Sequence, residues 1–241
     1  MATRSLKQMC QDCADETKGP RPTTIIDNTN AEALELLRLA TKVNRTLAAC
    51  FPWQILRKET TFTSVATETQ TSALASDFDR FVPETFWNRT DKVFVSGPIT
   101  PVEWHSLKAL SYDDTQHPKM MLRADTMLIV PTLAASKTLA WEYITNKIVD
   151  ITATGTPKTD FTIDTDIPLV NDELIIRGMI WEWLSAEGLP NEMAAESYES
   201  YFNYKTKNDQ PNARVLISGD IFGGARHFTG EPKAVGSGSI T

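Results

Sequence analysis

The side chains best suited to chemistry are three carboxylates near the middle of the chain. Asp77 and Asp79 stand two positions apart, so an extended backbone would point both to one side, and Glu84 follows soon after. Paired carboxyl groups can act as general acid and base in glycoside hydrolysis. In the structural alternative, which we favour, Asp77 caps a turn and Asp79 forms an ion pair with Arg80 or Arg89.

A second group of acids, Asp160, Asp164 and Asp166, suggests a calcium loop. The segment lacks the glycine and the distal bidentate glutamate of a helical calcium-binding loop. Aspartates that form turns just before a helix are the commoner explanation. We therefore predict no metal here.

The spacing of Cys10 and Cys13 is that of a metal or redox motif. Both thiols, however, share a helical apolar stripe with Leu6, Met9 and Ala14. A zinc site needs about four ligands, and the three histidines lie far away in the sequence. The pattern predicts two cysteines packed in a core.

The tryptophans could form a platform on which sugars or bases stack. They occur in strongly apolar segments, which favours core positions for most of them. The six are Trp53, Trp87, Trp104, Trp141, Trp181 and Trp183.

The sequence contains no phosphate-binding, dinucleotide-binding, zinc-protease or nucleophile-elbow motif. We therefore predict a protein that is not an enzyme and uses no cofactor.

Composition excludes several classes of protein. The 241 residues are 41% hydrophobic and 23% charged, which is typical of globular proteins. A net charge of -7 argues against a protein that grips nucleic acid phosphates. No apolar run reaches the roughly 18 residues that a membrane helix needs, and the first 16 residues lack the apolar core of a secretion signal. We expect a chain without a membrane span.

Apolar residues at helical spacing precede and follow the central part of the chain. A capping box, Thr29 with Glu32, predicts a helix that ends before Pro52 and has an apolar face of Leu36, Leu39, Ala40, Val43, Leu47 and Cys50. Asn171 is expected to cap an apolar helix that stops at Gly188 in a Schellman-like turn. A last helix is predicted over 191–207.

The segment between the helices has the pattern of strands, predicted over 60–65, 92–96, 120–123, 126–131 and 139–146. Ala124 and Asp125 indicate a tight hairpin. Two helical pieces are expected to interrupt the strands, a short one at 76–80 and another at 101–110 with Pro101 in its first turn.

The last residues differ in kind. Six of the 11 glycines lie in the final 23 residues, and residues 205–241 carry net charge +2 against -9 for the rest. Apolar residues are spaced along this segment, whereas a disordered tail would contain few of them. We predict an arm that orders on a partner protein through Arg214, Leu216, Ile217, Ile221, Phe222, Arg226 and Phe228.

Together these patterns predict an α+β fold: a helical bundle from the N- and C-terminal segments, a central β-rich sandwich- or barrel-like insertion, and an extended C-terminal arm. The expected regions are 1–58 and 156–207 for the bundle, 59–155 for the insertion and 208–241 for the arm.

An ordered series of short motifs within about residues 30–205 resembles the head-to-tail adaptor proteins of short-tailed bacteriophages, also called tail accessory or tail tubular A-like proteins. The most specific motif of the series is the turn from Gly97 to Pro101, which precedes a predicted helix that contains Trp104. The residues that carry the resemblance include Trp53, Asp79, Arg80, Trp87, Asn88, Arg89, Gly97, Pro98, Pro101, Trp104, Pro168, Trp181 and Trp183.

The resemblance implies a structural protein of the virion neck, assembled in the host cytoplasm. Such adaptors form a ring, usually of twelve subunits, beneath the portal protein, and dock the tail nozzle or fibres. Their ring extends the channel through which DNA passes without being specifically bound, and a C-terminal extension climbs onto the portal. Two alternatives stay open: a virion-carried peptidoglycan hydrolase using Asp79 or Glu84, and a tail-tube or fibre-docking component without portal contact.

Overall fold

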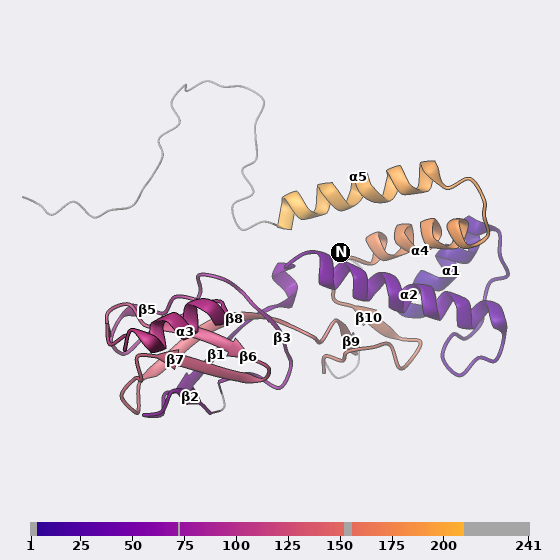
Figure 1. Ribbon diagram of the computed structural model, residues 1–241. Coiled ribbons are helices and arrows are strands. Elements are labelled where there is room, and N and C mark those ends of the chain that lie inside the picture. Colours follow the sequence, from indigo (N-terminus) through magenta and orange to yellow (C-terminus); the bar gives the residue numbers. More distant parts are fainter. Residues whose placement is uncertain (1–3, 72, 152–155, 210–241) are drawn as a thin grey trace, which may run out of the picture. The chain divides into compact units, whose positions relative to one another are not determined.

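The computed structural model describes residues 4–71, 73–151 and 156–209, and within these ranges the fold is α+β with antiparallel sheets (Figure 1). These ranges belong to one unit of the chain, 1–211, and the second unit, 212–241, lies outside them. The helices are α1 (Leu6–Thr17), α2 (Ala31–Cys50), the 3-10 turn η1 (Gln54–Leu56), α3 (Pro101–Ala109), α4 (Asp172–Ala186) and α5 (Glu192–Asp209). The strands are β1 (Arg57–Thr63), β2 (Thr69–Gln70), β3 (Phe78–Phe81), β4 (Trp87–Asn88), β5 (Val93–Phe94), β6 (Lys119–Arg123), β7 (Thr126–Val130), β8 (Thr138–Thr145), β9 (Val149–Ile151) and β10 (Asp166–Pro168).

Short polar side chains begin the long helices, as the sequence predicts. Asn171 caps α4 by accepting a hydrogen bond from the backbone N–H of Leu174. The capping residue of α2 is Asn30 rather than Thr29, and its side chain accepts from the N–H of Glu32 at 3.2 Å. Asparagine is as good a cap as threonine, so the capping-box prediction was wrong by one residue.

The predicted stop of α4 is confirmed as a Schellman motif. The N–H of Leu189 donates to the carbonyl of Leu184 at 2.9 Å, and the N–H of Gly188 donates to that of Ser185 at 3.3 Å. Gly188 has φ +66°, a left-handed conformation that glycine adopts without a steric penalty. This turn reverses the chain into α5.

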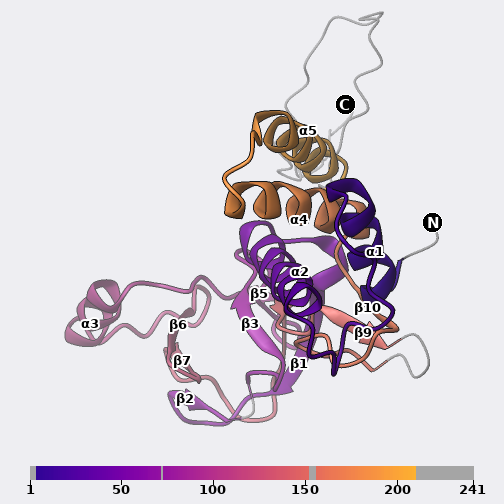
Figure 2. The ribbon, with the colours of Figure 1, turned by 90° about the vertical axis from the view of Figure 1, so that its right-hand side faces the viewer.

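Helix α4 is the centre of the helical part. It packs on α1, α2 and α5, and in both views it lies between α2 and α5 (Figures 1 and 2). A Cβ added at Gly178 would lie 2.6 Å from a methyl carbon of Val43, so glycine allows α2 and α4 to approach closely here. Leu39, Leu47, Leu174, Ile175 and Met179 are among the residues of this core.

Strand β8 is the centre of the largest sheet. It pairs with β1 along one edge, and with β3 and β4 along the other, while β5 extends the sheet from β4. Leu139, Trp141 and Tyr143 alternate along β8 and pack in the β-sheet core, whereas Ile144 belongs to the core of the helices. One strand therefore contributes to both cores.

A second sheet, in the order β2-β7-β6, contains the predicted hairpin at Ala124 and Asp125. Helix α3 begins at Pro101, as predicted, and buries Trp104 against Met121, Leu128 and Val130. Gly97, at φ +147°, precedes this helix, and a Cβ there would lie 2.4 Å from the carbonyl oxygen of Met120. The backbone itself thus excludes any larger residue at this turn.

The prediction of a short helix over 76–80 was wrong, because Phe78–Phe81 forms β3. This strand pairs with β8, and the register shifts between Phe78 and Arg80, as at a β-bulge. Tertiary pairing with a buried strand overrides the weak local preference of four residues.

Arg80 connects β3 to α2. Its guanidinium donates to the carbonyl oxygens of Ala49 at 2.6 Å, Ala48 at 2.8 Å and Phe51 at 3.2 Å. Helix α2 has no basic residue in its own last turn. Arg80 therefore supplies, from a distant strand, the positive charge that a helix C-terminus favours.

Candidate functional site

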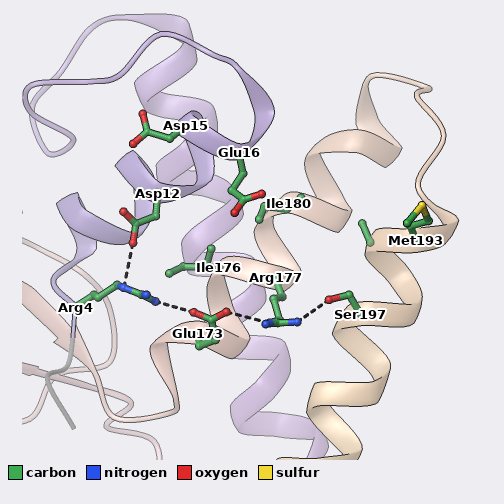
Figure 3. A pocket seen from close by; sticks show the side chains of 11 residues that line it. Arg4, Asp12, Asp15, Glu16, Glu173, Ile176, Arg177, Ile180, Met193 and Ser197 are labelled. Atoms are coloured by element: carbon green, nitrogen blue, oxygen red, sulfur yellow. Dashed lines mark hydrogen bonds and ion pairs between the residues drawn. The ribbon is translucent and has the colours of Figure 1, made fainter.

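A large open groove lies between α1, α4 and α5 (Figure 3). Its volume is about 870 Å³. Its residues include three acids from α1, two apolar residues from α4 and the 86%-exposed Met193 of α5, and the full set is Arg4, Asp12, Asp15, Glu16, Glu173, Ile176, Arg177, Ile180, Met193, Ala194 and Ser197.

A chain of ion pairs crosses this groove. Arg4 lies between Asp12, at 3.0 Å, and Glu173, at 2.8 Å. The other carboxyl oxygen of Glu173 accepts from Arg177 at 3.0 Å, and Arg177 donates to the hydroxyl of Ser197 at 2.6 Å. These contacts thus join Arg4, which precedes α1, to α1, α4 and α5 (Figure 3).

These pairs favour the charged forms of Glu173 and Arg4. Hydrogen bonding to Arg4, and then to Arg177, lowers the pKa of Glu173 despite partial burial. The hydrogen bond with Glu173 correspondingly raises the pKa of Arg4. A carboxylate with a lowered pKa is a poor proton donor near neutral pH. The groove is therefore poorly suited to acid–base chemistry through Glu173.

Asp77 has a structural role that differs from the predicted turn cap. Its carboxylate accepts from Lys58 Nζ at 2.6 Å, Tyr143 Oη at 2.7 Å and Thr145 Oγ1 at 2.8 Å. Partial burial opposes ionisation, but the hydrogen bonds from Lys58, Tyr143 and Thr145 lower the pKa of Asp77 to about 2. The group stays ionised and ties β1, β3 and β8 together.

The other two candidate carboxylates lie at the surface. Asp79 is exposed and borders a hollow of about 290 Å³ that Arg45 also lines, and Glu84 is exposed with φ +62°. The predicted ion pair of Asp79 with Arg80 or Arg89 was wrong. Arg80 binds the end of α2, and Arg89 pairs with Glu59 at 2.8 Å.

The three acids of the suspected calcium loop bind different partners. Asp160 pairs with Arg45 at 2.6 Å, and Asp164 accepts from the backbone N–H of Ile26 at 2.7 Å. Asp166 is fully buried and pairs with Lys158 at 2.8 Å. Nowhere in the described ranges do three or more ligating side chains gather as a metal site would require.

Cys10 and Cys13 are fully buried in α1, as the apolar stripe predicts. Burial raises the pKa of Cys13 to about 12 and raises that of Cys10 as well. Cys50, placed by the sequence on an apolar face, is instead exposed. The end of α2 turns this residue away from the core.

We expect iodoacetamide to label one cysteine per native chain at neutral pH, and three in denaturant, because only the thiolate reacts and only Cys50 is accessible. Mass spectrometry of the alkylated protein measures the number. Cys50→Ser is the matched control and should label none while native. Fast native labelling of Cys10 or Cys13 would contradict their place in the core.

Most of the motif residues hold elements together. Trp53 is buried and donates from Nε1 to the carbonyl of Leu47 at 2.7 Å. The side chain of Asn88 accepts from the N–H groups of Thr90 and Asp91. The remaining motif residues include Pro168 in β10, Trp181, which stacks on Tyr198, and Trp183, which packs on the helical core.

Of the six tryptophans, Trp53, Trp104 and Trp141 are buried, Trp181 and Trp183 are half-buried, and Trp87 is exposed. Three of the tryptophans are thus core residues, Trp183 packs against the helical core, and Trp87 is an exception to the predicted core positions. The predicted arm residues, Arg214, Leu216, Ile217, Ile221, Phe222, Arg226 and Phe228, lie outside the described residues.

The sequence did not single out Arg4, Asp12 or Arg177 as site residues. Glu173 and Arg177 stand four residues apart, a spacing that indicates a helical ion pair. The contact of Arg4 with Glu173 spans most of the chain and leaves no local pattern.

Neither a family model nor a curated protein matches the chain. No helix of the described residues combines the length and apolar character that crossing a bilayer demands.

Proposed function

We propose that this protein is a head-to-tail adaptor of a short-tailed bacteriophage. In this role it forms a ring of twelve copies beneath the portal protein and docks the tail nozzle or fibres. The proposed architecture is a helical bundle with a β-rich insertion and a C-terminal arm that binds portal. The observation that carries the proposal is the ordered motif series, whose described members mainly join structural elements.

The distribution of charge supports a channel component. Residues 156–209 carry 11 acids and four bases, and Glu192, Glu196 and Glu199 of α5 are exposed. An acidic surface repels DNA phosphates, whereas each neutralised phosphate would add affinity and slow the passage of DNA. A ring with an acidic lumen would let the genome pass without holding it.

Removal of residues 210–241 tests the role of the arm. The truncation belongs after Asp209, because its carboxylate accepts from the backbone N–H of Gln54 at 2.8 Å. We expect the shortened chain to lose portal binding, since the proposed anchors are gone, and to keep its circular dichroism spectrum and melting temperature. Native mass spectrometry of each chain mixed with portal measures binding.

The matched control replaces Leu216 and Phe222 by serine in the full-length chain, which removes anchors without changing length. Portal binding that survives both changes would refute the proposed role of the arm and favour a component without portal contact. A peptidoglycan zymogram on the same preparation separates the enzyme alternative. Clearing that is lost in Asp79→Asn or Glu84→Gln would overturn a purely structural role.

A further inference from the structure

Trp87 is unusual among the tryptophans of this chain because it is 46% exposed, whereas Trp53, Trp104 and Trp141 are at most 4% exposed. It lies on β4, in the sheet built around β8. Its ring borders a hollow of about 480 Å³. Small-molecule sites are hollows lined by aromatic side chains together with a few polar groups, and this hollow has both.

The sheet register places the residues around this ring. Trp87 lies directly opposite Ala140 of β8, and Glu142, two residues further along, shares that face. Glu142 in turn lies opposite Glu59 of β1. The small side chain of Ala140 leaves space beside the indole, and the two glutamates border that space.

Trp87 and its polar neighbours are held in place. The indole packs edge-to-face on Phe94 at 5.5 Å between ring centres, and backbone pairing joins β4 to both β5 and β8. Arg89 binds Glu59 at 2.8 Å, and Arg57 lies 3.5 Å from Glu142. A ligand would therefore meet groups that are already oriented.

The charges that line the hollow cancel. Glu59 and Glu142 face Arg89 and Lys92, and Thr85 and Asn88 add neutral polar groups. This balance suits neither a phosphate nor a strongly cationic ligand. It suits an uncharged molecule with many hydroxyl groups, because carboxylates accept and guanidinium groups donate hydrogen bonds to hydroxyls.

We propose that this hollow is a saccharide-binding site, in which Trp87 stacks on the C–H face of a pyranose ring and Glu59, Arg89 and Glu142 bind its hydroxyls. The electron-rich face of an indole attracts C–H groups that carry partial positive charge. The site goes beyond the adaptor function and does not depend on it.

The size of the hollow favours a saccharide over a second copy of the chain. Pockets of about 300–1,000 Å³ hold small molecules, whereas a stable protein interface buries about 800 Å² on each partner. The aromatic ring stands among charged side chains, which the centres of protein interfaces usually lack. The alternative occupant is a second copy of the chain, and the experiment below distinguishes it from a saccharide.

The experiment titrates the full-length protein with maltotriose, cellotriose, chitotriose and mannotriose, each up to about 10 mM, by saturation-transfer NMR and isothermal calorimetry. We expect at least one of them to bind. Trp87→Ala should weaken that binding about tenfold or more, because it removes the stacking surface, and Trp87→Phe should retain part of it.

Tyr204→Ala is the matched control, since Tyr204 is an exposed aromatic residue on α5, away from the hollow. It should leave saccharide binding unchanged. Absence of binding to all four probes, or equal binding by wild type and Trp87→Ala, would overturn the proposal. A wild-type dimer that Trp87→Ala dissociates would overturn it too, in favour of a second copy as the occupant. None of these outcomes bears on portal binding.

Discussion

Replacing Asp77 by alanine is expected to lower the free energy of unfolding by about 3 kcal/mol. The substitution leaves the ammonium group of Lys58 and the hydroxyls of Tyr143 and Thr145 without their shared acceptor. The ammonium group of Lys58 is partly exposed and can be rehydrated, but Tyr143 and Thr145 are buried, so the loss of their acceptor is costly. The three contacts also fix the start of β3 on β8, so the sheet should loosen at this edge.

The same carboxylate predicts a pH dependence. The pKa of Asp77 is about 2 in the folded protein, against about 3.9 for an unperturbed aspartate. Its contribution to stability is therefore fully present above about pH 4 and is lost as the pH falls towards about 2. Wild type should lose more stability across this interval than Asp77→Asn does, since the amide does not titrate.

Urea unfolding followed by circular dichroism at neutral pH and at acidic pH measures both effects. Asp79→Ala is the matched control, because this neighbouring carboxylate is exposed, and it should change the free energy of unfolding by less than about 0.5 kcal/mol. Equal losses for the two substitutions would show that the hydrogen bonds of Asp77 do not stabilise the fold.

Replacing Arg80 by methionine is expected to cost about 2 kcal/mol. Methionine keeps much of the apolar stem but removes the donors to the carbonyl oxygens of Ala48, Ala49 and Phe51. The negative end of α2 would then face β3 without a compensating charge. We expect the last turn of α2 to fray in addition to the loss of global stability.

Chemical denaturation measures the global effect, and hydrogen exchange of the backbone amides at residues 46–51 measures the local one. Arg89→Met is the comparison, because Arg89 pairs with Glu59 at the surface, where both side chains are about half exposed. Its loss should cost less than about 1 kcal/mol. Unchanged exchange at the end of α2 in Arg80→Met would count against the capping role of Arg80.

Local signals predicted the long elements. The apolar stripe of Leu36, Leu39, Val43 and Leu47 placed α2, and Asn171 with Gly188 located both ends of α4. A composition rich in β-branched and aromatic residues between turn residues predicted β8 to within one residue at each end. These signals are reliable because helix periodicity and capping depend on residues only a few positions apart.

Short elements and long-range contacts were missed. Residues 76–80 were predicted to be helical because no sequence signal near them indicates that Phe78–Phe81 pairs with β8. Asp79 was expected to pair with Arg80, yet Arg80 binds carbonyl oxygens about thirty residues earlier in the chain. Every residue carries a backbone carbonyl, so the sequence gives no signal of which carbonyl oxygens an arginine binds.

The amino-acid sequence by itself thus determined the α+β class, the main helices and strands, the buried pair Cys10 and Cys13, and the acidic character of the chain. Only the tertiary structure decided which carboxylates are bound, that Arg4, Glu173 and Arg177 meet in one groove, and that Trp87 is exposed. The physical reason is the distance along the sequence between the residues that interact. Periodicity and caps are set by neighbours within a few residues, whereas ion pairs, burial and hollows depend on which distant segments pack together.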